Sequence, residues 1–197
     1  MGADSEATRR TILLAARDVI VERGYQAATF QQIAARAGVS RPTLHYYFRS
    51  REHIYDVLLA EIHHKLVDCA AEAQREPGLR NQLSHFLDSL HRSSVEERTT
   101  LRFLVAARLE HRRGLHGAEG AARVFAAVHS FLDAVVGQAV RRGELPTDID
   151  VAVVADMLAA LFWGAGFHGG FLRPDGFDSD NSGVARQLVS LFEKGLL

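Results

Sequence analysis

Residues 29–52 read TFQQIAARAGVSRPTLHYYFRSRE, and this stretch decides the fold. It opens on a Thr followed three residues later by a Gln, which is the pattern of a capping box at the start of a helix. Gly38 stands where a residue in the left-handed conformation can end that helix. Ser40 can cap a second helix, and Pro42 is tolerated in its first turn, where the missing amide would have had no partner. The stretch therefore predicts two short helices joined by a tight turn.

The second predicted helix has an inner and an outer side. Leu44 falls on the inner side at helical spacing, together with either Tyr47 or Phe48, while the outer side carries Arg, Thr, His and Tyr. Such side chains hydrogen-bond to phosphates and base edges, and a helix-turn-helix presents them to the major groove of DNA. A helical hairpin without this function has similar spacing, so the flanking sequence has to decide between the two interpretations.

The flanking sequence carries a recognisable order of motifs. Gly38-Val39-Ser40 is followed by Tyr46-Tyr47-Phe48, Ser50-Arg51-Glu52 and Ile54, and an amphipathic stretch precedes them all. With these motifs, about the first quarter of the chain resembles the DNA-binding domain of TetR-family transcriptional regulators. Two positions depart from the family pattern. His45 stands where the family commonly has Tyr, and Arg51 replaces the usual Lys while keeping a positive charge that we expect to face phosphate.

The resemblance and the exposed side chains together predict the DNA contacts. We expect Arg41, Thr43 and His45 to contact bases, with Arg41 best suited to guanine because its planar group can bind two acceptors at once. Phosphate contacts are expected from Thr29, Tyr46, Tyr47 and Arg51 and from the capped helix N-termini. Gln31 can contact either bases or phosphate, and a place in the core is the alternative for Tyr47. The predicted DNA-binding residues are Thr29, Gln31, Ser40, Arg41, Pro42, Thr43, His45, Tyr46, Tyr47 and Arg51.

The composition predicts an all-α fold. Of the 197 residues, 47% are hydrophobic and only four are Pro, and no alternation typical of β-strands occurs. We expect a three-helix helix-turn-helix domain over residues 1–50, and a helical ligand-binding and dimerisation domain over residues 51–197. About nine helices are expected in all, near residues 5–23, 30–37, 41–48, 50–75, 79–91, 95–113, 121–142, 148–168 and 181–194.

Charge and cysteine content narrow the class of protein. Residues 1–53 hold eight Arg and five acidic residues, a net charge of +3, whereas the whole chain has a net charge of −1. This distribution of charge suits a protein that contacts only a few DNA phosphates, through its first residues. The single cysteine, Cys69, excludes an internal disulfide and suits a reducing cytoplasm. No membrane span is expected, because the most apolar run, residues 151–167, is short and contains Asp156.

A homodimer is the expected working state. One helix-turn-helix reads few bases, and proteins of this kind place two recognition helices about 34–36 Å apart on successive major grooves. The last two predicted helices are the expected interface. The first of them is rich in Ala, Leu and Phe and contains Gly164 and Gly166, and the second offers Val184, Leu188, Leu191 and Phe192. Ordinary core packing is the alternative explanation for these apolar residues.

A cavity for a small, largely apolar effector is expected in the body of the protein. Aromatic, aliphatic and His side chains recur at helical spacing on three of its predicted helices, and such surfaces suit an apolar ligand, although plain core packing explains any one of them. The predicted ligand-binding residues are Phe103, Ala107, His111, Phe125, His129, Leu132, Met157, Leu161, Trp163 and Phe167. A ligand that binds one conformer better than another would release the protein from its operator.

Other classes of protein fit the sequence less well. A metal-responsive helix-turn-helix sensor is the alternative, because Glu61, His64 and Asp68 share one helix face as plausible ligands. No Gly-x-Ser-x-Gly elbow, phosphate loop or dinucleotide fingerprint occurs in the chain. We therefore expect a repressor without catalytic activity, cofactor or bound metal, whose partners are a double-stranded DNA operator, a small-molecule effector and a second copy of the chain.

Overall fold

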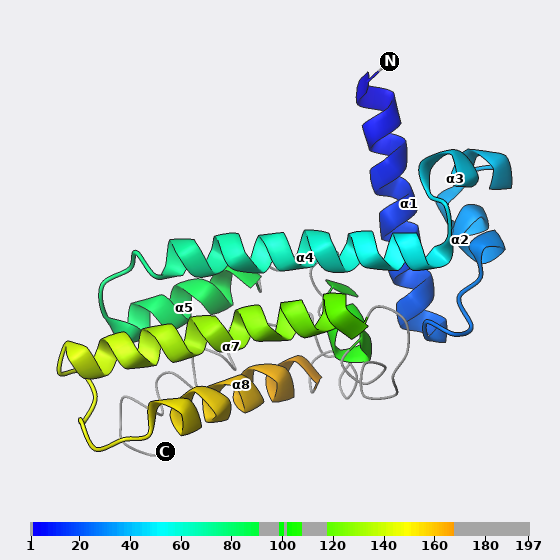
Figure 1. Ribbon diagram of the computed structural model, residues 1–197. Helices are drawn as coiled ribbons and strands as arrows, with labels where there is room; N and C mark the ends of the chain where they lie inside the picture. The colour runs from blue at the N-terminus through cyan, green and yellow to red at the C-terminus, as the bar shows by residue number, and fades with distance from the viewer. Residues whose placement is uncertain (1, 91–98, 101, 108–117, 168–197) are drawn as a thin grey trace. The chain divides into compact units, whose positions relative to one another are not determined.

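A computed structural model describes residues 2–90, 99–100, 102–107 and 118–167 (Figure 1), and within these ranges the chain forms helices and no strand. The predicted all-α fold is confirmed. The helices are α1 Gly2–Arg23, α2 Phe30–Ala37, α3 Arg41–Tyr47, α4 Arg51–Ala73, α5 Gly78–Leu90, α7 Ala118–Arg141 and α8 Val151–Phe167. Residues 102–107 are also helical. The ninth predicted helix, near residues 181–194, lies outside the described residues.

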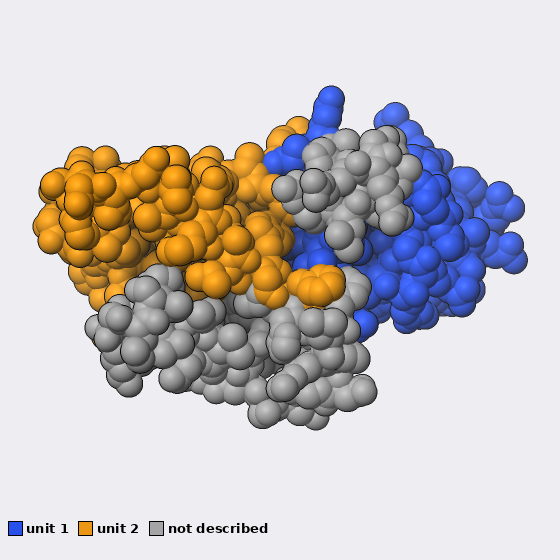
Figure 2. Space-filling model, turned by 90° about the horizontal axis from the view of Figure 1, so that it is seen from below, with its two compact units in different colours: residues 1–62, 99–122 blue, residues 63–98, 123–197 orange. Residues whose placement is uncertain are grey.

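The chain divides into two compact units, which Figure 2 shows in blue and orange. The first contains residues 1–62 and 99–122, and the second contains residues 63–98 and 123–197. These units place the start of α4 and residues 99–122 with the helix-turn-helix, whereas the expected functional boundary after residue 50 stays a prediction. Buried aromatic packing explains this placement, since the ring of Tyr55 lies 5.3 Å from that of Phe103 and both residues are buried.

The core of the first unit forms around α1. Apolar residues at helical spacing along one side of α1 are all buried: Ile12, Leu13, Ala16, Val19 and Ile20. Ile33 and Ala34 of α2 are buried as well, and α3 contributes Leu44, which is fully buried. This core holds α2 and α3 in place from beneath, which leaves their other faces for solvent or a partner.

The core of the second unit is largely aromatic. Phe86 of α5 stacks on Phe131 of α7 with ring centroids 4.2 Å apart, and it also approaches Phe162 of α8 at 6.0 Å. These contacts explain why α5, α7 and α8 run alongside one another in Figure 1. By length and composition alone, α7 is the one helix among the described residues that could cross a membrane. Its residues Val128 and Val135 are buried inside the unit, as in the core helix of a globular protein.

Candidate nucleic-acid interface

The start of α2 has the predicted capping box. The amide of Gln32 donates to Thr29 Oγ1 at 3.2 Å, and the amide of Thr29 donates to Gln32 Oε1 at 2.9 Å. At the other end of α2, Gly38 has φ +66°, in the left-handed region. A Cβ added there would meet nothing within 4 Å, so glycine is required by the backbone angle and not by crowding. Helix α2 is thus fixed by the local sequence at both of its ends.

The recognition helix α3 is short and anchored from within. Ser40 caps it, since its Oγ accepts from the amide of Thr43 at 3.1 Å, and the two hydroxyl groups also hydrogen-bond at 2.7 Å. Pro42 lies in the first turn, as predicted. Leu44 and Phe48 are buried, while Tyr47 is half-buried. Phe48 is therefore the second inward residue that the sequence left open.

The outer side of α3 forms an exposed strip. Arg41, Pro42, His45 and Tyr46 are exposed, and Tyr46 is 81% exposed, which is unusual for a large aromatic side chain. Tyr46 packs edge-on against Tyr47, with the ring centroids 5.1 Å apart. This strip has the side chains that can donate to phosphate or base acceptors.

Phe30 is a member of the site that the sequence did not reveal. It is the first residue of α2, it is half-buried, and its ring centroid lies 4.6 Å from that of His45. The contact restricts the imidazole of His45, so that this predicted base-reading side chain is held against a hydrophobic surface. Only the arrangement of α2 against α3 brings the two rings together, and no local pattern would have indicated it.

Other arginines of the first unit form ion pairs within the protein, whereas Arg41 forms none with any described residue. Arg36 pairs with Glu22 at 2.6 Å, and this hydrogen bond holds the pKa of Glu22 below its usual range. Arg9 pairs with Glu61 at 3.2 Å. Within the described part of the chain, by contrast, no hydrogen bond or ion pair engages the side chain of Arg41, which is exposed at the start of α3. Arg41 thus keeps its charge and its donors for a partner.

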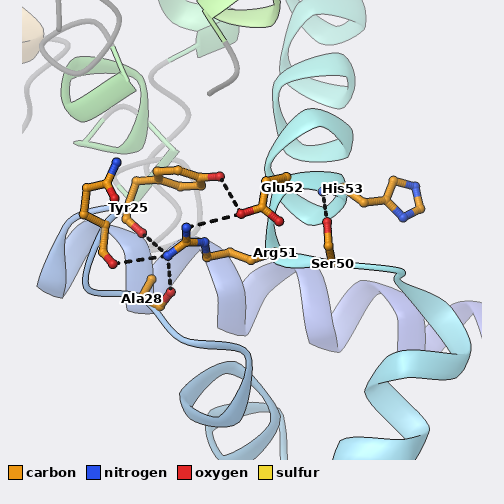
Figure 3. Close-up of polar contacts among 7 residues, drawn as sticks. Tyr25, Ala28, Ser50, Arg51, Glu52 and His53 are labelled. Carbon is orange, nitrogen blue, oxygen red and sulfur yellow. Dashed lines mark hydrogen bonds and ion pairs between the residues drawn. The ribbon is translucent and has the colours of Figure 1, made fainter. Parts of the chain in front are cut away.

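Arg51 has a different environment from the one predicted. Its Nη1 donates to the carbonyl oxygens of Tyr25, Gln26 and Ala28 at 3.1, 3.2 and 3.0 Å, and its Nη2 pairs with Glu52 at 3.2 Å (Figure 3). The predicted phosphate contact from Arg51 does not agree with this geometry, because the guanidinium is already used on the loop before α2. The phosphate contact of Arg51 therefore stays a prediction that this geometry does not favour.

The helix-turn-helix geometry agrees with the comparison with known families. The model of bacterial regulatory proteins of the tetR family matches residues 12–58, which contain α2, the turn at Gly38, α3 and the start of α4. The chain belongs to the TetR family. It is therefore a DNA-binding transcriptional regulator of the helix-turn-helix type.

Individual members of the TetR family are similar over longer stretches. The HTH-type transcriptional regulator SrpR of Pseudomonas putida is 27% identical over 170 residues, covering 85% of this chain and 77% of SrpR. An uncharacterized HTH-type regulator, TtgW of Pseudomonas putida, is 31% identical over 90 residues, covering 45% of this chain and 67% of TtgW. The crystal structure of FadR from Bacillus subtilis in complex with stearoyl-CoA has a TM-score of 0.70 at 20% identity, covering 92% of this chain and 96% of FadR. That likeness shows a shared fold.

The predicted ligand-binding residues of this TetR-family chain fall into both units. Phe103 and Ala107 lie in the first unit and are buried, with Phe103 against Tyr55, so they belong to the core around the helix-turn-helix. His111 lies outside the described residues. The other predicted residues lie in the second unit: Phe125, His129, Leu132, Met157, Leu161, Trp163 and Phe167.

Within the second unit the predicted residues differ in exposure. Phe125 and Trp163 pack edge to face at 4.8 Å, and Leu132 is buried. His129 Nε2 lies 2.8 Å from Asp156 Oδ1 on the surface. Met157 and Phe167 are 45% and 40% exposed.

The described residues of this chain do not support the alternative that it is a metal sensor. Among the described residues, no three His, Cys, Asp or Glu side chains lie close enough together to hold a metal ion. Glu61, one of the proposed ligands, is paired with Arg9, and its companions His64 and Asp68 are exposed on α4.

Proposed function

We propose that this TetR-family regulator binds a palindromic DNA operator as a homodimer, represses transcription, and leaves the operator when a small, largely apolar ligand binds its second unit. The observation that carries this proposal is the strip on α3, where Arg41, His45 and Tyr46 are exposed on a helix that is capped and anchored from beneath. A helix held in this way fits the major groove. A repressor of this kind works beside the chromosome, in the cytoplasm.

Selection of duplexes from a random-sequence library tests the DNA-binding proposal. The recovered sites are expected to contain two inverted half-sites with centres about 10 base pairs apart or a multiple of that spacing, because each half-site meets one recognition helix. A promoter that carries the recovered site should be transcribed less when the protein is present. Recovery of unrelated sequences, or of a single half-site, would contradict the proposal.

Replacing Arg41 by glutamine should weaken binding to the recovered operator by about 1–3 kcal/mol and relax sequence preference at one position in each half-site. The cause is the loss of a planar group that can bind two guanine acceptors. Gel-shift titrations against operators substituted at each position measure both effects. The matched control is Arg36→Gln, which removes a charge that is paired with Glu22 on the surface, and binding should change little. Unchanged sequence preference for Arg41→Gln would refute the base contact.

The dimer proposal rests on the surface of α8. Val153, Met157, Ala160, Gly164 and Phe167 are all exposed, at alternating spacings of four and three residues. This spacing places them on one side of the helix, as in helices that pack against each other in pairs. The two small residues allow a second helix to approach closely, and an exposed apolar row of this kind marks an interaction surface. The matching helix of a second copy is the proposed partner.

The ligand proposal rests on a chain of aromatic contacts in the second unit. Phe125 touches Trp163 at 4.8 Å, Trp163 touches Phe162 at 5.0 Å, and Phe162 approaches Phe86 at 6.0 Å. Connected rings offer an apolar, polarizable lining for an acyl or aromatic ligand. The structural neighbour FadR, whose structure contains stearoyl-CoA, supports a search that begins with acyl-CoA compounds.

Trp163 is the single tryptophan of the chain, so its fluorescence should report ligand binding directly. Titration with stearoyl-CoA, shorter acyl-CoA compounds and apolar drug-like compounds is expected to shift the emission for at least one class, and the same compound should release the operator. Trp163→Ala should raise the concentration needed for release by about tenfold, because an aromatic contact of about 0.5–1.5 kcal/mol and buried area are lost. Trp163→Phe, the control, should keep most of the response. If no compound both bound and released operator, the ligand proposal would fail.

A further inference from the structure

Three backbone carbonyl groups of the loop between α1 and α2 converge on one nitrogen atom of Arg51, and the amide of Ala28 also donates to the carbonyl oxygen of Gly24 at 3.1 Å. Gly24 follows the last residue of α1 with φ +79°, and Thr29 caps α2. Between them, the carbonyl oxygens of Tyr25, Gln26 and Ala28 all lie 3.0–3.2 Å from Nη1 of Arg51, as Figure 3 shows in part. Carbonyl oxygens accept hydrogen bonds and cannot pair with one another, so these three need a donor from elsewhere in the chain, and Nη1 of Arg51 supplies it.

Neighbouring side chains hold the guanidinium group of Arg51 in place. Its guanidinium carbon lies 4.4 Å above the ring of Tyr25, and its Nη2 pairs with Glu52 at 3.2 Å. Glu52 also accepts from the hydroxyl of Tyr25 at 3.4 Å. Burial, together with the nearby charge of Glu52, raises the pKa of Tyr25 to about 12, so this hydroxyl keeps its proton and keeps donating in mildly alkaline solution as well as at neutral pH. Tyr25 and Ala28 are buried, so the hydrogen bonds to their carbonyl oxygens are partly shielded from water, whereas the bond to Gln26 is exposed.

We propose that Arg51 is a positioning residue for DNA binding, which fixes the loop of residues 25–28 and thereby the start of α2 without touching phosphate. The inference rests on the proposed use of α2 and α3 as the DNA-binding surface. The start of α2 matters to that surface, because Phe30 in its first turn holds the ring of His45. A loop that moved would shift Thr29 and Phe30 together.

The geometry predicts which substitutions are tolerated. Because the three carbonyl oxygens converge on one nitrogen, a lysine ammonium, which carries three N–H donors, can replace that nitrogen. Arg51→Lys should therefore retain the loop, although it loses the planar group that stacks on Tyr25. Arg51→Met keeps a long apolar side chain and loses every donor.

Operator affinity measured over a range of salt concentrations tests the proposal, with the operator recovered by the wild-type protein as probe. Arg51→Met should weaken binding by about tenfold or more, since several hydrogen bonds to a charged group are lost, while the slope of log affinity against log salt stays at the wild-type value. Arg51→Lys should bind within about fivefold of wild type, because the ammonium keeps its donors and only the contact with the ring of Tyr25 is weakened. The concentration of protein able to bind DNA is measured for each variant by titrating it against operator at a concentration far above the dissociation constant. This control distinguishes a variant that binds more weakly from one of which a smaller fraction is folded.

The matched control is Arg36→Met, which removes the same charge from a surface pair with Glu22. It should bind within about threefold of wild type, because exposed ion pairs contribute little. A direct phosphate contact by Arg51 would instead reduce the slope for Arg51→Met by about 0.9 per subunit, or about 1.8 for a dimer on its operator. Either that reduced slope or an affinity of Arg51→Met within about twofold of wild type overturns the proposal.

Hydrogen exchange of the protein without DNA tests the same inference independently. Arg51→Met should exchange faster over residues 25–32, while residues 54–66 of α4 keep the wild-type rates. Unchanged exchange over residues 25–32 would overturn the inference whatever the DNA result. If the wild-type chain selected no operator, the proposed function would fail by itself, and the exchange rates would still decide whether Arg51 fixes the loop.

Discussion

Replacing Met157 by glutamate is expected to convert the protein to a monomer and to weaken operator binding by about 100-fold or more, because two linked half-site contacts bind far more tightly than one. Met157 is 45% exposed in the apolar row of α8 and lies near the middle of that row. Two copies of the helix packed through this row would bring two carboxylates together away from water. Burying unpaired like charges is strongly unfavourable, so the pair of helices should separate.

Sedimentation velocity measures the oligomeric state of Met157→Glu, and gel shifts with full and half operators measure its DNA binding. The folded monomer should still shift a half-site at low salt, since α3 is unaffected. Met157→Leu is the control and should remain a dimer with wild-type affinity, because its volume and polarity are conserved. A dimeric Met157→Glu protein would show that the subunits pair through some other surface.

Replacing Leu44 by alanine is expected to destabilise the protein by about 2–5 kcal/mol, the range for large-to-small substitutions in a core. Leu44 is fully buried and is one of two buried anchors of the recognition helix, with Phe48. The helix has seven residues, and isolated helices below about 12–15 residues are marginal in water. The recognition helix therefore depends on this packing, and operator binding should fall together with stability.

Urea denaturation followed by circular dichroism measures the loss for Leu44→Ala, and hydrogen exchange shows whether residues 41–48 open first. Leu44→Met is the matched control, with an expected cost below about 1.5 kcal/mol because the volume is nearly conserved. A second control is Tyr46→Ala, in the same helix. It should leave the free energy of unfolding almost unchanged, since Tyr46 is 81% exposed. A loss below about 1 kcal/mol for Leu44→Ala would mean that other contacts hold α3.

The helix-turn-helix could be predicted from the sequence because its elements obey local rules. The capping box at Thr29, the left-handed Gly38 and the cap at Ser40 each depend on residues at most three positions apart, and the structure confirms all three. The buried stripe of α1 follows from helical periodicity in the same way. The all-α fold follows from the sum of such patterns.

The parts that could not be predicted depend on residues far apart in the chain. Arg51 was assigned to phosphate because a charge after a recognition helix usually faces DNA, whereas its partners lie 23–26 positions earlier. The contact between Phe30 and His45 depends on how α2 crosses α3. The helical spacing of aromatic residues also could not show that Phe103 packs in the core of the first unit, whereas Phe125 and Trp163 lie in the second unit.

The packing of residues 99–122 with the helix-turn-helix has a consequence for protein engineering. The contact between Tyr55 and Phe103 is part of the unit that holds the recognition helix, and Arg17 of α1 donates to Thr100 at 2.9 Å. The ring of Tyr25 also lies 4.6 Å from that of Tyr55. A chimaera that grafts the first fifty residues onto a different regulator would separate Tyr25 from Tyr55 and leave Arg17 without the hydroxyl of Thr100. To transfer the operator specificity of this protein to another regulator, the junction should therefore lie beyond residue 62. The recipient should also have residues equivalent to Thr100 and Phe103.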